Sequence, residues 1–108
     1  MLRFILRDAG FQVEAVGTGG AALDRLDRAP VDAVVLDLGL PDERGPAVLA
    51  RLRELEANDG STAHPAWVVI TAQDRADVTA RFGPLGGRFL SKPFDPWDLV
   101  HLLQASVR

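Results

Sequence analysis

Three polar residues stand at the ends of short segments that read as strands in this chain, and their side chains are of kinds that take part in chemistry. They are Asp37 after residues 33–36, Thr71 after residues 67–70, and Lys92 after residues 88–91. Short runs rich in Val, Leu and Ile predict strands that are buried on both faces, as in parallel sheets. A carboxylate does not fit inside such a strand, so we place Asp37 at the carboxyl end, where it can reach water or a metal ion.

The carboxyl ends of parallel strands meet at one edge of a sheet, so we expect Asp37, Thr71 and Lys92 to lie close together. As a set they suit phosphoryl transfer, with a carboxylate nucleophile, an ammonium that neutralises phosphate charge, and a hydroxyl that donates to a phosphate oxygen. Each residue alone has a plainer interpretation, as a loop carboxylate, a β-branched strand residue and an exposed charge. The phosphoryl-transfer hypothesis therefore depends on all three together.

The spacing of apolar residues predicts the helices that surround these strands. Residues 2–9 form the first helix, with Gly10 as its end; the others cover residues 21–28, 48–55 and 74–82, and a last helix opens with Asp95 as cap and Pro96 in its first turn. The last helix is expected to turn four residues inward: Trp97, Val100, Leu103 and Val107.

The segment Phe11–Val16 alternates apolar and polar residues, which predicts a half-buried strand between the first two helices. Strands that alternate with helices imply right-handed crossovers and a mostly parallel sheet with helices on both faces. The fold class predicted from the residues is therefore α/β, in one domain.

Composition narrows the class of protein further. The chain has 108 residues, a formal net charge of −3 and no cysteine, and its two histidines, His64 and His101, are isolated. These features predict a single domain without disulfides or a zinc site and without direct nucleic-acid binding. No apolar run approaches the roughly 18 residues that a membrane span needs, so we expect a cytoplasmic protein without membrane contact.

Three linked motifs carry a family resemblance. The segments Val34–Asp42 with Gly45, Val69–Ala72 and Phe89–Phe94 resemble, in order and spacing, the receiver domain of bacterial two-component response regulators. The resemblance covers essentially the whole chain. It implies a flavodoxin-like, doubly wound parallel sheet with strand order 2-1-3-4-5.

The resemblance also implies a role for each matching residue. Asp37 is the phospho-acceptor, Thr71 the switch hydroxyl, Lys92 the phosphate contact, Phe89 the aromatic switch, Pro93 the site of a cis peptide bond, and Gly39 a backbone carbonyl ligand for Mg²⁺ beside Asp37. In this family an acyl phosphate on the aspartate moves the threonine, and the aromatic residue turns inward. That movement changes the face formed by the last two helices and the strand between them.

The chain departs from the family at its start. The family begins with an apolar strand that ends in two adjacent acidic residues, which hold Mg²⁺, whereas Met1 here falls inside the first helix. We therefore expect residues 1–108 to form one N-terminally truncated receiver domain whose first, central strand is missing. Three explanations for the missing strand are open: the gene model has lost it, another protomer supplies it, or the two flanking strands pair directly with each other. Weak or absent Mg²⁺ binding is expected, because Mg²⁺ needs several oxygen ligands.

The leading functional hypothesis is a phospho-accepting signalling module, a switch rather than a turnover enzyme. Its phosphoryl donor would be a histidine kinase or a phosphotransfer protein. The alternative is a degenerate receiver that works without phosphorylation as a protein-interaction or dimerisation module, and homodimerisation is open under both hypotheses. An aspartate-nucleophile phosphatase is a remote alternative, because Gly39 occupies the place where that chemistry wants a second carboxylate.

Overall fold

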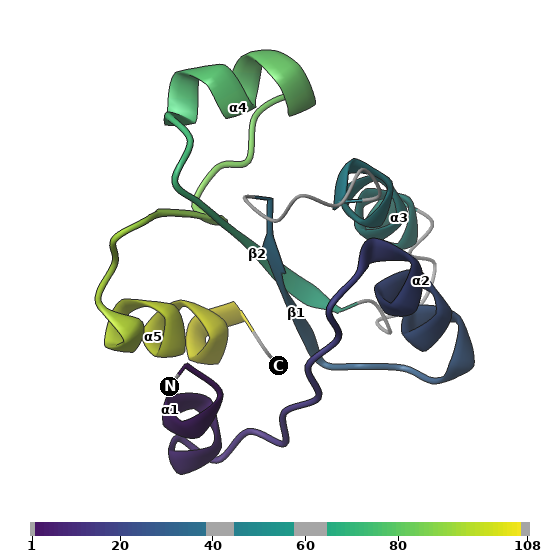
Figure 1. Ribbon diagram of the computed structural model, residues 1–108, viewed down its shortest axis with the longest axis vertical. Helices are drawn as coiled ribbons and strands as arrows, with labels where there is room; N and C mark the ends of the chain where they lie inside the picture. Colours follow the sequence, from purple (N-terminus) through teal and green to yellow (C-terminus); the bar gives the residue numbers. More distant parts are fainter. Residues whose placement is uncertain (1, 39–44, 58–64, 107–108) are drawn as a thin grey trace.

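The computed structural model describes residues 2–38, 45–57 and 65–106, in which two helices are followed by strands that alternate with helices (Figure 1). The helices are α1 (Leu2–Asp8), α2 (Gly19–Arg28), α3 (Gly45–Ala57), α4 (Arg75–Phe82) and α5 (Pro96–Ser106). The strands are β1 (Ala33–Asp37), β2 (Ala66–Thr71) and β3 (Phe89–Ser91). The sheet is parallel and its order is β1-β2-β3, so the predicted α/β class with a parallel sheet is confirmed.

The strand β2 is the centre of this sheet. Val35 of β1 lies opposite Val68, and Val69 lies opposite Phe89 of β3. Residues 67–71 of β2 are all buried, as the continuous apolar run predicts, whereas all five residues of β1 are only half-buried. This difference shows that β1 is less covered than its neighbour.

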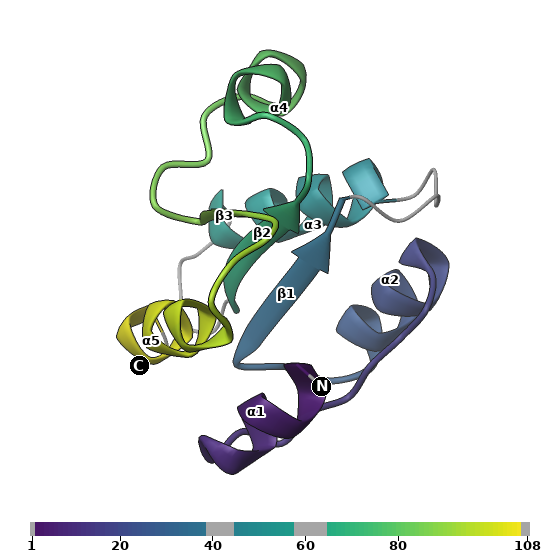
Figure 2. The same cartoon turned by 60° about the vertical axis from the view of Figure 1, so that its left-hand side comes forward.

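Helices cover both faces of the sheet (Figures 1 and 2). On one face α2 and α3 pack against β2 residues Trp67 and Val69; on the other α1 and α5 pack against Val68 and Ile70. Successive side chains of a strand point to opposite faces, so β2 contributes to both hydrophobic clusters. The helix α4 lies beyond the carboxyl ends of the strands in the two views, and its buried Val78 and half-buried Phe82 belong to the hydrophobic cluster on the α2 and α3 side.

The predicted strand Phe11–Val16 is wrong, because this segment has no regular secondary structure. Phe11 and Val13 are still half-buried and Gln12 and Glu14 are exposed, so burial alternates over residues 11–14, whereas Val16 is exposed. Within the described part of the chain, the backbone of residues 12–16 forms no hydrogen bond with another backbone group. An alternating pattern reports which side chains meet the core, but a strand also needs a neighbour that completes its ladder.

The helices differ from the sequence predictions in several details, and α3 extends three residues before and two residues beyond the predicted range 48–55. The helix α2 begins two residues early, at Gly19, because the Oγ1 of Thr18 accepts a hydrogen bond from the Ala21 N–H at 3.1 Å and so caps the helix. Trp97 is 47% exposed instead of turned inward. The buried side of α5 is formed by Leu99, Val100 and Leu103, and Trp97 lies roughly 110° around the helix axis from it.

Several other predicted features of the first and last helices are confirmed. Gly10, at φ of 100°, follows the end of α1, and Asp95 caps α5 by accepting a hydrogen bond from the Trp97 N–H at 2.9 Å. Val100 and Leu103 are buried as predicted, and Val107 lies outside the described residues. No helix in the described ranges is both long enough and apolar enough to cross a bilayer.

Candidate functional site

Asp37 and Lys92 meet at the carboxyl edge of the sheet. Asp37 is the last residue of β1, and Lys92 directly follows β3. Its Nζ lies 2.6 Å from Oδ2 of Asp37, so the lysine side chain reaches past the intervening strand β2. The Lys92 N–H also donates to the Thr71 carbonyl at 2.8 Å, which ties the end of β3 to the end of β2. Both side chains remain in contact with solvent, at 38% exposed for the lysine and 21% for the aspartate.

Thr71 ends the strand that lies between these two residues. It is fully buried, and its Oγ1 accepts a hydrogen bond from the Gln73 N–H at 3.1 Å. A hydroxyl that accepts one hydrogen bond keeps its own O–H to donate. The edge therefore holds a carboxylate, an ammonium and a hydroxyl on three adjacent strands, and the first two are in direct contact.

Phe89 begins β3 and lies beneath the first turn of α4. Its side chain is 9% exposed and packs in the cluster on the α3 side of the sheet. The guanidinium of Arg75 lies over the ring at 5.0 Å from its centroid, and the Nη2 of the same residue donates to the Gly86 carbonyl at 2.9 Å. Arg75 therefore joins the start of α4, the loop before β3 and the aromatic ring.

The predicted site includes two further residues, Pro93 and Gly39. The peptide bond between Lys92 and Pro93 is cis. Gly39, for which a metal-ligand role was predicted, lies outside the described residues.

The donor set at this edge does not by itself make a magnesium site. In the ranges that the structure describes, no three His, Cys, Asp or Glu residues lie together in a metal-binding arrangement. Mg²⁺ requires near-octahedral oxygen ligation and in proteins takes one or two carboxylates with its remaining sites on water or phosphate. The carboxylate of Asp37 is also in contact with the Lys92 ammonium. These residues therefore fit Mg²⁺ poorly, and no chemical step is assigned to the metal.

A charged cluster at the opposite edge of the sheet was not predicted. Arg88 makes two hydrogen bonds of 2.5 Å to the carboxylate of Glu56, which also accepts from Nε1 of Trp67 at 3.0 Å. Arg88 lies over the Trp67 ring at 4.3 Å, and the hydrogen bond to Glu56 raises the pKa of the arginine. The cluster joins α3, β2 and the approach to β3; because Glu56 and Arg88 are 32 residues apart, no local pattern reveals it.

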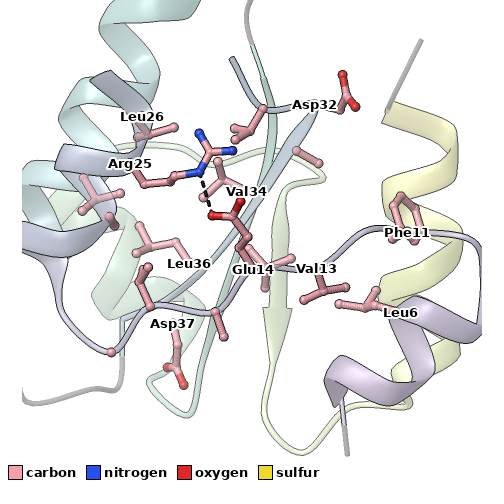
Figure 3. Close-up of a pocket in the computed structure, with 18 of the residues that line it drawn as sticks. Leu6, Phe11, Val13, Glu14, Arg25, Leu26, Asp32, Val34, Leu36 and Asp37 are labelled. Atoms are coloured by element: carbon pink, nitrogen blue, oxygen red, sulfur yellow. Dashed lines mark hydrogen bonds and ion pairs between the residues drawn. The ribbon is translucent and has the colours of Figure 1, made fainter. Parts of the chain in front are cut away.

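A groove separates the segment 11–16 from β1 (Figure 3). Its volume is about 1200 Å³. On one side lie Leu26, Val34 and Leu36, and on the other Leu6, Phe11 and Val13. Figure 3 also shows Glu14 turned toward Arg25, whose Nε lies 2.7 Å from the carboxylate. This ion pair joins the segment to α2 across the groove.

Comparisons with known proteins agree with this arrangement. The family model described as "Response regulator receiver domain" matches residues 1–104. Among curated proteins, the transcriptional regulatory protein KdpE of Mycobacterium tuberculosis is 35% identical over 107 residues, which are 99% of this chain and 45% of that protein. The DNA-binding response regulator MtrA of Mycolicibacterium smegmatis is 34% identical over 109 residues, or 100% of this chain and 45% of that protein. The chain thus spans less than half the length of these relatives.

Solved structures are similar as well. A CheY-like receiver domain from Methylobacillus flagellatus superposes with a TM-score of 0.73 at 29% identity, over 95% of this chain and 83% of the other. The receiver domain of the sensor histidine kinase PA1611 from Pseudomonas aeruginosa, which has a magnesium ion in its active-site cleft, gives 0.74 at 26% identity over 97% and 84%. Together with the family match over residues 1–104, these likenesses show that the chain belongs to the response regulator receiver domain family.

Proposed function

We propose that this chain is a phospho-accepting receiver module of a two-component system, with Asp37 as the acceptor. The observation that carries the proposal is the 2.6 Å contact between Lys92 Nζ and Asp37 Oδ2 at the carboxyl edge of the sheet. An ammonium in that position neutralises the charge of an incoming phosphoryl group, and buried Thr71 has a hydroxyl proton to donate beside it. The donor is a phosphohistidine of a histidine kinase or of a phosphotransfer protein.

In the proposed reaction, a carboxylate oxygen of Asp37 forms a bond to the phosphorus atom. The bond between phosphorus and the donor's imidazole nitrogen breaks, and its electron pair stays on that nitrogen. The product is an acyl phosphate, which adds about −1.5 to −2 charges at one point. Lys92 then contacts the phosphoryl oxygens in place of the carboxylate, and Thr71 moves toward them.

The readout of this event is the face formed by α4, β3 and α5. Movement of Thr71 frees space toward which Phe89 turns, and Phe89 is the ring that Arg75 covers. A change at the ring is therefore passed to the first turn of α4. The relatives named above are regulators about twice as long, so we infer that this face controls an output outside residues 1–108 or a homodimer contact.

We also infer that β1, β2 and β3 are the third, fourth and fifth strands of the family order 2-1-3-4-5, within a receiver domain that spans residues 1–108. The groove beside β1 is then the place of the first, central strand. In the family, this first strand carries the acidic pair that holds Mg²⁺. Slow phosphorylation and weak Mg²⁺ binding follow, because Mg²⁺ would have Asp37 as its carboxylate ligand with a Gly39 carbonyl.

Intact-mass measurement after incubation with acetyl phosphate and Mg²⁺ tests the acceptor. We expect one phosphoryl group on the wild-type chain and none on Asp37→Asn. The matched control is Asp32→Asn, which changes an exposed carboxylate near the amino end of the same strand and should label like the wild type. Equal labelling of Asp37→Asn and the wild type would reject Asp37 as the acceptor.

A second function, a receiver that works without phosphorylation, is favoured by the poor fit to Mg²⁺ described above. Beryllofluoride with Mg²⁺ mimics the acyl phosphate and separates the two. The fluorescence of Trp67 and Trp97 and the sedimentation coefficient are measured before and after its addition. A change that Asp37→Asn abolishes supports the phosphorylated switch, and no change supports the second function.

A further inference from the structure

The start of α4 is tied to the sheet by Arg75. Asp74, the residue before the helix, makes no capping hydrogen bond with its side chain. The Arg75 side chain is exposed, but its guanidinium lies over the Phe89 ring at 5.0 Å from the centroid, and its Nη2 donates to the Gly86 carbonyl at 2.9 Å. One side chain therefore connects the first turn of α4 to β3 and to the loop before β3.

The carboxyl end of α4 is held from α3. Arg53 donates hydrogen bonds to the carbonyls of Phe82 and Pro84. A guanidinium in this position satisfies carbonyls at a helix end that have no partner within the helix. Leu85, the next residue in the loop, is buried in the core cluster. This end of the helix is thus anchored without Arg75.

The segment between β2 and α4 links Thr71 to the start of the helix. Oγ1 of Thr71 accepts a hydrogen bond from the Gln73 N–H at 3.1 Å, and Arg75 follows Gln73 by two residues. In the reaction proposed above, Thr71 moves toward the phosphoryl oxygens, so its hydrogen bond to Gln73 changes. The same step turns Phe89, and the ring leaves the guanidinium of Arg75.

A contact that is made in only one state of a switch favours that state. In this structure the contact of Arg75 with the Phe89 ring accompanies the contact of Lys92 with Asp37. Within the described ranges, Arg75 forms no ion pair that competes for its guanidinium. A cation–π contact at an exposed site corresponds to about a two- to fivefold change in an equilibrium constant. Arg75 can therefore bias the switch measurably.

We propose that Arg75 is a latch, which holds Phe89 and the first turn of α4 in the arrangement of the unphosphorylated chain. It lowers the population of the phosphorylated arrangement, and the strength of its contact with the ring sets by how much. Arg75 is a positioning residue, because it acts through Phe89. The inference rests on the proposed role of Asp37 as phospho-acceptor and adds the residue that regulates the switch.

Beryllofluoride titration in the presence of Mg²⁺ tests the latch, with the ¹H–¹⁵N resonances of the Thr71 and Phe89 amides as the readout. Arg75→Gln keeps a side-chain N–H that can donate to the Gly86 carbonyl and removes the cation over the ring. We expect beryllofluoride to bind this variant about two- to fivefold more tightly than the wild type. Arg75→Lys keeps the cation and should bind like the wild type.

Matched variants separate the latch from a general loss of stability. Arg53→Ala removes two hydrogen bonds at the other end of the same helix, and Arg81→Gln removes the cation that lies 5.1 Å from the Phe82 ring centroid. Neither should tighten beryllofluoride binding. In a Phe89→Leu background, Arg75→Gln should have no effect on the affinity, because the ring is absent. Circular dichroism shows that each variant is folded.

The outcomes distinguish this inference from the proposed function. If the wild type responds to beryllofluoride but binds it as tightly as Arg75→Gln or more tightly, the latch is overturned and Asp37 stands as the acceptor. Tightening that persists in the Phe89→Leu background would also overturn the latch, because the effect would not pass through the ring. Absence of any response of the wild type over a range of Mg²⁺ concentrations would overturn both proposals.

Discussion

The guanidinium of Arg75 lies 5.0 Å above the ring of Phe89 and so joins the first turn of α4 to the start of β3. The same side chain donates to the Gly86 carbonyl at 2.9 Å. At the other end of α4, Arg53 of α3 donates hydrogen bonds to the carbonyls of Phe82 and Pro84, and Val78 and Phe82 pack in the core cluster. Arg75 is thus a polar link between the first turn of this helix and the start of β3.

Arg75→Ala should lower the free energy of unfolding by about 1 kcal/mol, because an exposed cation–π contact contributes about 0.5–1 kcal/mol and a hydrogen bond a similar amount. Urea unfolding followed by circular dichroism measures this loss. A double-mutant cycle with Phe89→Leu isolates the contact with the ring, and we expect a coupling energy of about 0.5 kcal/mol. Additive effects of the two substitutions would contradict the link.

Glu56→Ala should destabilise the fold by about 1–2 kcal/mol, since it removes the acceptor for both Arg88 and Trp67 Nε1. We expect the loss of stability to fall in the lower part of this range, because the side chains of Glu56 and Arg88 are each about one third exposed. Glu56→Gln keeps one acceptor oxygen and should lose less. The matched control is Glu54→Ala, which breaks only the exposed pair with Arg51; a loss as large as that of Glu56→Ala would argue against a special role for the cluster.

Thr18→Ala should cost about 1 kcal/mol of unfolding free energy, because the Ala21 N–H loses its hydrogen-bond acceptor at the start of α2. Thr18→Ser retains an acceptor oxygen and serves as the control. Helix content from far-ultraviolet circular dichroism and the midpoint of urea unfolding are the measurements. If the alanine and serine variants unfold alike, the hydroxyl does not cap the helix.

Acid should weaken the link between segment 11–16 and α2. The hydrogen bond from Arg25 lowers the pKa of Glu14 below its ordinary value, so the folded chain holds this proton less tightly than the unfolded chain does. The contribution of Glu14 to stability is therefore present above the ordinary glutamate pKa and is lost as the pH falls through the lowered, folded value. Because Glu14 is 64% exposed, the effect is small and salt-sensitive.

Urea unfolding from pH 7 down to pH 2 checks this expectation, with Glu14→Gln for comparison. The stability difference between the wild type and the variant should shrink as the pH falls and should be smaller in high salt. Parallel curves over the whole range would show that the ion pair adds nothing to the folded state.

The strands that carry the site could be predicted from sequence because their signal is local. Continuous apolar runs are typical of strands buried on both faces, and β1 and β2 occupy those runs. Because parallel strands end at one edge of a sheet, the sequence predicts that Asp37 and Lys92 lie close together. In the structure, Nζ of Lys92 lies 2.6 Å from Oδ2 of Asp37. The roles of these residues in phosphoryl transfer remain a prediction.

What the sequence could not reveal depends on partners distant in the chain. The alternation of residues 11–16 is compatible with a strand, but pairing requires a backbone neighbour that the pattern does not report. The contact of Glu56 with Arg88 joins residues 32 positions apart, and no spacing rule links them. The exposure of Trp97 follows from which side of α5 meets the sheet, which depends on the packing of the whole layer.

The open edge of β1 also bears on how this chain behaves at high concentration. Unpaired strand edges are templates on which further chains add, and short apolar segments with high β-propensity and low charge favour such assembly. Asp32 and Asp37 flank the apolar residues 33–36, and the exposed carboxylate of Asp32 is a gatekeeper charge against edge-to-edge pairing. Replacing Asp32 by an apolar residue would lengthen this apolar stretch and should make the chain more prone to aggregate through the edge of β1.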